Sequence, residues 1–228
     1  MKKYTIGLIT GALLAVSAMM FIGAQNKNLV TAVTLRDGGT VEIISNHKIS
    51  GNKIERVGKY TEWYHGRIKE EGNYKNDLKD GKWTSWKDNR DGDWIKQLEV
   101  TYKNGKEDGK KTSWHSNGKK YKEGNLKNGE QHGKFTEWHK NGKKRQEETY
   151  KNGKRDGLHT EWYDNGKKKG EVTYKASEED GLYTRWYENG KKERGNTFKD
   201  GELISSICWD EDGNECECSE YNRWRGCK

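Results

Sequence analysis

A tryptophan that returns about every 24 residues constrains the fold of this chain more than any other feature of the sequence. A glycine lies five residues before each of the first six of these tryptophans, and a threonine lies two residues before each. Self-similarity at a fixed period indicates tandem copies of one supersecondary unit, each stabilised by its neighbours. The series consists of Trp63, Trp86, Trp114, Trp138, Trp162, Trp186 and Trp209.

Each repeat has the pattern of a β-hairpin. In the fourth repeat, residues 133–140 predict a strand and residues 143–151 predict the returning strand. Between them, Asn141-Gly142 predicts a two-residue type I′ turn, because Asn and Gly tolerate positive φ. Asn152-Gly153 predicts a second such turn into the next repeat. We therefore expect an all-β fold, an elongated single-layer antiparallel meander with two strands per repeat.

Strand alternation places the side chains of each repeat on two faces. Thr136 and Trp138 share one face, and Phe135, Glu137 and His139 share the other. Strands two apart are separated by about 10 Å, so equivalent tryptophans should form a ladder. Because only 29% of the residues are hydrophobic, we predict a structural core made of this ladder. The candidate binding residues of the opposite face are Tyr64, Phe135, His139, Tyr163, Tyr183 and Tyr187.

The first 24 residues have the layout of a secretory signal peptide. Lys2 and Lys3 precede an apolar stretch from Tyr4 to Ile22, and Gly23-Ala24 supplies small residues before a cleavage site. An uncleaved membrane anchor is the alternative. Cleavage would lower the formal net charge from +8 to +6, since the segment carries two lysines and no acid. We expect a signal-peptide helix over 1–24 and a secreted, periplasmic or cell-surface protein.

Both ends of the repeat array are predicted to carry caps. Residues 25–57 include a more aliphatic hairpin and are expected to form an N-terminal β cap, followed by six repeats over 58–204. Residues 205–228 hold a partial repeat and all four cysteines. In an exported chain an even number of cysteines predicts disulfides. Cys216 and Cys218 are poorly placed to bond each other, because they would point to opposite sides of an extended strand or strain a tight loop. Two pairings remain open, each joining Cys208 and Cys227 to that pair.

Lysine pairs follow the first turn of four successive repeats and should line one edge of the sheet. Such an edge could hold an anionic polymer or lipid surface. The alternative is that the lysines keep the turns soluble and prevent edge-to-edge aggregation. The pairs are Lys119 and Lys120, Lys143 and Lys144, Lys167 and Lys168, and Lys191 and Lys192.

The repeated pattern Gly-x-x-Thr-x-Trp-(Tyr/His)-x-Asn-Gly-Lys-Lys, followed by Tyr-Lys-Asn-Gly-Lys-x-(Asp/His)-Gly, resembles the MORN repeat over about residues 58–214. More narrowly, it is similar to the bacterial variant in YwqK-like proteins, which are often described as antitoxins. The resemblance implies a curved sheet of β-hairpins that contacts proteins or membrane lipids and carries no catalytic residues. An antitoxin would be cytosolic, whereas the N-terminal segment and cysteines predict export.

We therefore predict a non-enzymatic, exported scaffold that binds a protein or an anionic envelope component through its sheet face and lysine edge. The alternatives are an antitoxin-like or immunity-like inhibitor of a toxin, and a module that binds cell-wall polysaccharide. No nucleophile-and-base pattern, phosphate-binding loop, cofactor motif or metal-ligand pattern stands out in the sequence. Neither a small-molecule substrate nor a nucleic-acid partner is expected, the latter because of export.

Overall fold

The computed structural model describes residues 18–21, 29–36, 40–50, 52–89, 91–218 and 227. These residues fall into two compact units, Met1–Gly109 and Lys110–Lys228. Most of the predicted signal segment lies outside the described residues, and its described part, Ala18–Phe21, forms a strand instead of the expected helix. Within the described residues no helix is long and apolar enough to span a membrane.

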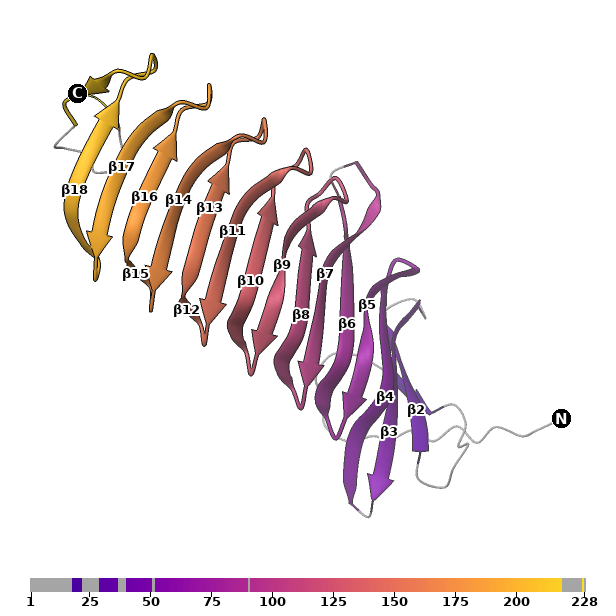
Figure 1. Cartoon of the computed structure of the whole chain (residues 1–228). Coiled ribbons are helices and arrows are strands. Elements are labelled where there is room, and N and C mark those ends of the chain that lie inside the picture. The colour runs from indigo at the N-terminus through magenta and orange to yellow at the C-terminus, as the bar shows by residue number, and fades with distance from the viewer. Residues whose placement is uncertain are drawn as a thin grey trace. The chain divides into compact units, whose positions relative to one another are not determined.

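The first unit is an antiparallel meander in which each strand pairs with the next along the chain (Figure 1). The β2–β3 pair is the hairpin expected in the N-terminal cap. The strands are β1 (Ala18–Phe21), β2 (Leu29–Arg36), β3 (Thr40–Ser50), β4 (Lys53–Tyr64), β5 (Arg67–Lys75), β6 (Leu78–Asp88) and β7 (Trp94–Lys103). The division between the units falls within β8 (Lys106–Trp114).

The second unit continues with the same antiparallel pairing and the regular 24-residue period (Figure 1). In the fifth and sixth repeats, the strand that ends at the repeat tryptophan is interrupted, and a two-residue strand precedes it. The strands are β9 (Lys120–Lys127), β10 (Glu130–Trp138), β11 (Lys144–Lys151), β12 (Lys154–Arg155), β13 (Gly157–Trp162), β14 (Lys168–Lys175), β15 (Glu178–Glu179), β16 (Gly181–Trp186), β17 (Lys192–Lys199), β18 (Glu202–Trp209) and β19 (Glu215–Cys216).

Two kinds of turn connect these strands, and one differs from the prediction. Asn152 and Gly153 have φ values of 50° and 76°, as a two-residue type I′ turn requires. Between β10 and β11, however, Gly142 has positive φ but Asn141 does not. The Oδ1 atom of Asn141 accepts a hydrogen bond of 2.9 Å from the backbone N–H of Lys143. This Asx-type contact produces a three-residue turn ending in a glycine bulge instead of the expected type I′ turn.

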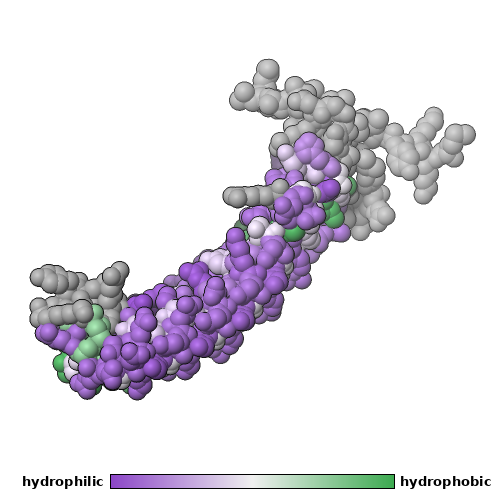
Figure 2. Space-filling view, turned by 90° about the horizontal axis from the view of Figure 1, so that it is seen from above, coloured by the Kyte–Doolittle hydropathy of each residue, from purple (hydrophilic) through white to green (hydrophobic). Residues whose placement is uncertain are grey.

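The core does not lie beneath the predicted tryptophan ladder but on the opposite face of the sheet. We call this the core face, and the other the tryptophan face. The core face holds the buried apolar side chains Trp83, Val100, Leu126, Phe135, Val172 and Phe198. The seven repeat tryptophans are half-buried. In the space-filling view, hydrophilic residues dominate the visible surface of the repeats (Figure 2).

Two glycines explain why the rings of the core face are buried in a single-layer sheet. A Cβ atom on Gly124 would lie 2.3 Å from the Phe135 ring, and one on Gly72 would lie 2.2 Å from the Trp83 indole. Each ring therefore lies flat against the backbone of the preceding strand. Burial of one such side chain contributes about 2–3 kcal/mol. The repeat tryptophans have no such glycine partner in common. They are therefore less deeply buried than Trp83 and Phe135 on the core face.

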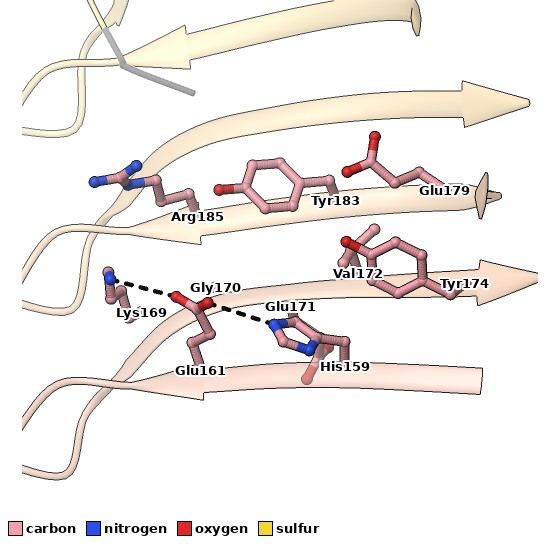
Figure 3. Close-up of a pocket in the computed structure, with 10 residues that line it drawn as sticks. All are labelled: His159, Glu161, Lys169, Gly170, Glu171, Val172, Tyr174, Glu179, Tyr183 and Arg185. Atoms are coloured by element: carbon pink, nitrogen blue, oxygen red, sulfur yellow. Dashed lines mark ion pairs between the residues drawn. The ribbon is translucent and has the colours of Figure 1, made fainter. Parts of the chain in front are cut away.

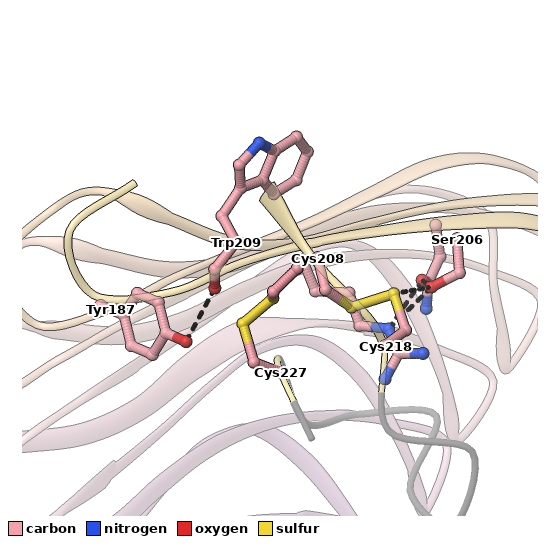
Figure 4. The surroundings of a disulfide bond; sticks show 9 residues. Tyr187, Ser206, Cys208, Trp209, Cys218 and Cys227 are labelled. Carbon is pink, nitrogen blue, oxygen red and sulfur yellow. Dashed lines mark hydrogen bonds between the residues drawn. A yellow bond between two sulfur atoms is a disulfide. The ribbon is translucent and has the colours of Figure 1, made fainter. Parts of the chain in front are cut away.

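The C-terminal cap is closed by two disulfides. Cys208 bonds to Cys218, and Cys216 bonds to Cys227, with Cα–Cα distances of 5.3 Å and 5.7 Å (Figure 4). This is one of the two pairings that the sequence left open. The first bond joins β18 to the chain just beyond β19, and Cys208 is fully buried. The disulfides thus secure the last described strands of the sheet.

Candidate functional site

The first lysine of each predicted pair is held by the turn of the following repeat. We call Lys119, Lys143, Lys167 and Lys191 the lysine row. Their Nζ atoms donate hydrogen bonds to the backbone carbonyl oxygens of Asn141, Asn165, Asn189 and Asp212, at 2.9, 2.7, 3.1 and 2.9 Å respectively. The predicted edge therefore exists, and its ammonium groups are fixed in position by the repeat that follows each one.

The second lysine of each pair lies on the tryptophan face. Lys120, Lys144 and Lys168 form ion pairs with Glu123, Glu147 and Glu171 at 2.7, 2.7 and 2.6 Å. Each ammonium group also lies 5.5–5.7 Å from the centre of the next repeat tryptophan. Lys192 lies 5.7 Å from the centre of the Trp209 ring. These contacts place the predicted binding lysines of this set over half-buried indoles.

Glu123 and Glu147, on the tryptophan face, are each held ionised by two lysines. Burial opposes ionisation of Glu123, but hydrogen bonds from Lys120 and Lys110 hold its pKa below the ordinary value. For Glu147, burial is likewise outweighed by Lys134 and Lys144, and its pKa is lowered. Lys120, Lys144 and Lys168, which we call the strand lysines, thus form ion pairs with carboxylates, whereas the lysine row binds carbonyl oxygens.

Most of the predicted binding residues that directly follow a repeat tryptophan are hydrogen-bonded to the next repeat. The Nε2 atom of His139 is 3.0 Å from the carbonyl oxygen of Trp162, and His115 makes the same contact with Trp138 at 2.8 Å. The Tyr163 and Tyr187 hydroxyls donate to the carbonyl oxygens of Trp186 and Trp209, at 2.7 and 2.9 Å. These side chains connect successive repeats. Tyr64, in the first unit, has 48% of its surface exposed.

The structure corrects the prediction for Phe135. Only 3% of its surface is exposed, because the ring covers Gly124 and meets Tyr150 edge to face at 5.4 Å between centroids. It belongs to the core and cannot reach a partner. Tyr183, also predicted as a binding residue, is half-buried and lines a pocket on the same face. Burial raises the pKa of its phenol to about 12.

This pocket has a volume of about 250 Å³ and lies over β13, β14 and β16 (Figure 3). Gly170 forms part of its wall, and its cross-strand neighbours are Glu161 on one side and Arg185 on the other. The position eight residues after the repeat tryptophan holds Lys122, Gln146 and Arg194 in the other repeats of the second unit. The missing side chain at Gly170 therefore opens the pocket.

A chain of charged groups forms one side of the pocket. Glu161 lies 3.5 Å from His159 and 3.3 Å from Lys169, and the other ring nitrogen of His159 lies 3.6 Å from Glu148 (Figure 3). Hydrogen bonding by His159 is the main reason why the pKa of Glu161 is lowered to about 2. The pKa of Glu148 also falls to about 2, because His159, Tyr150 and Arg155 outweigh its burial.

The same contacts govern the histidine itself. Burial lowers the pKa of His159, but the carboxylates of Glu148 and Glu161 outweigh this effect and raise it above 6.5. Sequence reasoning placed no function on His159, Glu161 or Arg185. The one signal available was Gly170, a glycine at a position where the neighbouring repeats have long polar side chains.

The fold and these surfaces define a tandem β-hairpin repeat scaffold. The family model described as MORN repeat variant matches residues 107–128, 131–152, 155–176 and 179–200. Residues 107–200 are thus four consecutive MORN-type repeats, as the sequence pattern predicted for this part of the chain. Repeats of this family are typically non-catalytic. No curated protein sequence matches the chain.

Proposed function

We propose that this protein is an exported, non-catalytic scaffold whose lysine row binds a linear anionic polymer of the cell envelope. The observation that carries the proposal is the set of four Nζ–carbonyl hydrogen bonds, at 2.7–3.1 Å, that hold Lys119, Lys143, Lys167 and Lys191 against the following turns. A carbonyl oxygen positions an ammonium group but has no net charge with which to neutralise it.

The contrast with the strand lysines supports this assignment. Lys120, Lys144 and Lys168 each meet a carboxylate, whereas no ion pair joins a lysine of the row to a carboxylate among the described residues. Successive row positions are two strands apart, roughly 10 Å. This spacing is comparable with the Debye length of about 8 Å at physiological salt, so the fields of neighbouring ammonium groups partly overlap. A polymer with regularly spaced anions complements such a row.

The charges of the residues at the turn tips make one end of the lysine row more attractive to anions than the other. The tip residue two positions after the tryptophan is Ser116 in the third repeat, Lys140 in the fourth, Asp164 in the fifth and Glu188 in the sixth. Acidic tips weaken the positive potential near Lys167 and Lys191. The strongest attraction for an anion therefore lies between Lys119 and Lys143.

A binding measurement with long-chain inorganic polyphosphate tests the proposal. Lys119, Lys143 and Lys167 are replaced together by Gln in one variant, and Lys120, Lys144 and Lys168 in the matched control. Both variants lose the same formal charge. We expect the first to bind much more weakly than the control, and wild-type binding to fall steeply with added salt, with a log–log slope of roughly −0.7 per lysine engaged. Equal losses in the two variants would contradict a specific role for the row.

The export signal, the YwqK-like relationship and the identity of the partner remain predictions. Fractionation of cells that produce the full chain with a C-terminal tag tests export, since the signal segment is retained. A pull-down from envelope and secreted fractions separates the alternatives: capture of one protein that survives moderate salt supports the immunity-like role. Retention on isolated wall material that is independent of salt supports the polysaccharide-binding role.

A further inference from the structure

From the second to the fifth repeat, a glutamate of the tryptophan face binds the lysine three residues before it. The distances between the Nζ atom and a carboxylate oxygen are 3.1, 2.7, 2.7 and 2.6 Å, for Lys96–Glu99, Lys120–Glu123, Lys144–Glu147 and Lys168–Glu171. The ammonium groups of the strand lysines also lie 5.5–5.7 Å from the centre of the next repeat tryptophan. The repeat thus has a recurring ammonium position between a carboxylate and an indole ring.

The first repeat has the carboxylate and the indole of this position but lacks the lysine. Ile68 stands three residues before Glu71, where the next four repeats have lysine. The half-buried Glu71 makes no hydrogen bond or ion pair within the part of the chain that the structure describes. In the same part of the chain, no cation lies over the ring of Trp86, the next repeat tryptophan. Both groups that hold an ammonium group in later repeats are therefore without one here.

Glu71 and Trp86 line one pocket of the first unit, with a volume of about 400 Å³. Thr84 connects them on the tryptophan face, since it is the cross-strand neighbour of Glu71 and stands two residues before Trp86. In the fourth repeat, Thr136 has the same relation to the carboxylate and the tryptophan that hold the Lys120 ammonium group. The first repeat therefore presents the framework of the ammonium position, with open space beside it.

Lys59 does not take the place of the missing lysine. It lines the pocket, but it stands at the repeat position of Lys134 and not at that of Lys144. Lys134 and Lys144 bind Glu147 together, at 2.8 and 2.7 Å. A lysine at the position of Lys59 thus leaves room for a second ammonium group on the same carboxylate.

Two further lysines of the pocket limit the charge of a guest. Lys82 and Lys96 line it, and both bind Glu99, at 2.8 and 3.1 Å. One carboxylate offsets only one of these two positive charges. A guest with a single positive charge reproduces the arrangement of the later repeats, whereas a second positive charge on the guest would be repelled.

We propose that this pocket binds a primary alkylammonium group with one positive charge, whose N–H groups donate to Glu71 and whose aliphatic stem lies against Trp86. An ammonium group has three donors and no acceptor, which suits a carboxylate. A cation within about 6 Å of an indole centre is attracted by the ring. The ligand has the chemistry of a lysine side chain. The site shares no residue with the lysine row and takes a cation where the row takes anions, so the two proposals can fail separately.

Ligand-detected NMR on the full repeat protein tests the inference. The probe is n-butylammonium, whose four-carbon stem matches that of lysine, and 1-butanol is the neutral control. We expect n-butylammonium to bind and 1-butanol to bind at least roughly tenfold more weakly, because the charge-assisted hydrogen bond is lost. Absence of n-butylammonium binding would overturn the proposal, as would equal binding of the alcohol.

Two further probes define the ligand. Putrescine carries a second ammonium group and should bind more weakly than n-butylammonium, and tighter binding would contradict the preference for one positive charge. Nα-acetyl-lysine amide presents the same ammonium group as a protein does. Its binding would show that a lysine of a partner protein fits the site, and binding of n-butylammonium alone would restrict the site to free amines.

Substitution of the isoleucine provides the matched test. Ile68→Lys supplies the lysine of the later repeats and should abolish the n-butylammonium signal, and Glu71→Gln should weaken binding roughly tenfold. Ile54→Lys adds the same charge at another exposed isoleucine of the first unit, where 51% of the side chain is exposed, and should leave binding unchanged. Thermal unfolding of the variants verifies that they fold. Wild-type binding by a folded Ile68→Lys protein would show that the pocket is not the site.

Discussion

The hydroxyl of Tyr163 donates a hydrogen bond of 2.7 Å to the backbone carbonyl oxygen of Trp186, 23 residues further along the chain. Tyr187 repeats the contact with Trp209 at 2.9 Å (Figure 4). His139 and His115 make its counterpart in the two preceding repeats. From the third to the sixth repeat, one position therefore joins each hairpin to the next. In a linear array, such nearest-neighbour contacts set the stability.

Removal of these hydroxyls should weaken the array. We expect Tyr163→Phe and Tyr187→Phe each to reduce the free energy of unfolding by about 1 kcal/mol, the usual contribution of one hydrogen bond. Urea unfolding followed by tryptophan fluorescence measures the change. Tyr64→Phe is the control, because the Tyr64 side chain is 48% exposed and makes no such contact. A loss in the control as large as in the two variants would argue against the connecting role.

Two glycines of the core face should respond differently to the same substitution. Gly124→Ala places a methyl group 2.3 Å from the Phe135 ring, and such overpacking costs typically about 1–3 kcal/mol. Gly170→Ala meets nothing closer than 3.9 Å and should be neutral or stabilising by up to about 1 kcal/mol, since alanine restricts the unfolded chain. Chemical unfolding of the two variants side by side provides the comparison. Equal destabilisation would show that there is no free space for a methyl group at Gly170.

The Glu148–His159–Glu161 chain should make stability depend on pH in both directions. The pKa values of Glu148 and Glu161 fall from 4.5 to about 2 on folding, so their contribution is complete above pH 4.5 and is lost as the pH falls toward 2. The pKa of His159 rises above 6.5, so its contribution is complete below pH 6.5 and is lost as the pH rises through the raised value. Stability should therefore peak between these limits.

Replacement of the histidine tests this dependence. His159→Gln should remove the loss of stability on the alkaline side and shift the acid limb to higher pH, because the main cause of the low pKa of Glu161 is gone. Urea midpoints measured from pH 2 to pH 8 report both effects. The exposed His132, replaced by Gln, is the control and should reproduce the wild-type profile. An unchanged profile in His159→Gln would contradict the assignment.

Loss of the first disulfide should loosen the C-terminal cap and little else. Cys208 and Cys218 close a short loop, and such a bond stabilises by about 3 kcal/mol in the chain-entropy account. In the Cys208→Ser, Cys218→Ser variant, hydrogen exchange should accelerate in β17, β18 and β19, and amides of β11 should keep their protection because repeats contact only their neighbours. Equal acceleration in β11 and β18 would mean that the array unfolds as one unit.

The fold class was predictable because it depends on local properties. Threonine and tryptophan at alternate positions specify a strand, and Asn152-Gly153 specifies a tight turn through its backbone conformation. The type of the first turn was predicted wrongly, because Asn141-Gly142 is the same dipeptide as Asn152-Gly153 but forms a different turn. The two turns differ in backbone conformation, since Asn152 has a φ of 50° whereas Asn141 does not have positive φ. In the first turn, the Oδ1 atom of Asn141 also accepts a hydrogen bond of 2.9 Å from the backbone N–H of Lys143.

Period and alternation in the sequence determined that this chain forms tandem antiparallel hairpins, with ring series on both faces and lysines along one edge. Only the tertiary structure decided which ring series is buried, because burial depends on whether the neighbouring strand offers a glycine, as Gly124 does beneath Phe135. It also decided that the lysine row bonds to carbonyl oxygens and that Gly170 leaves a pocket. These outcomes depend on contacts between residues of different strands, and a pattern along one repeat does not contain them.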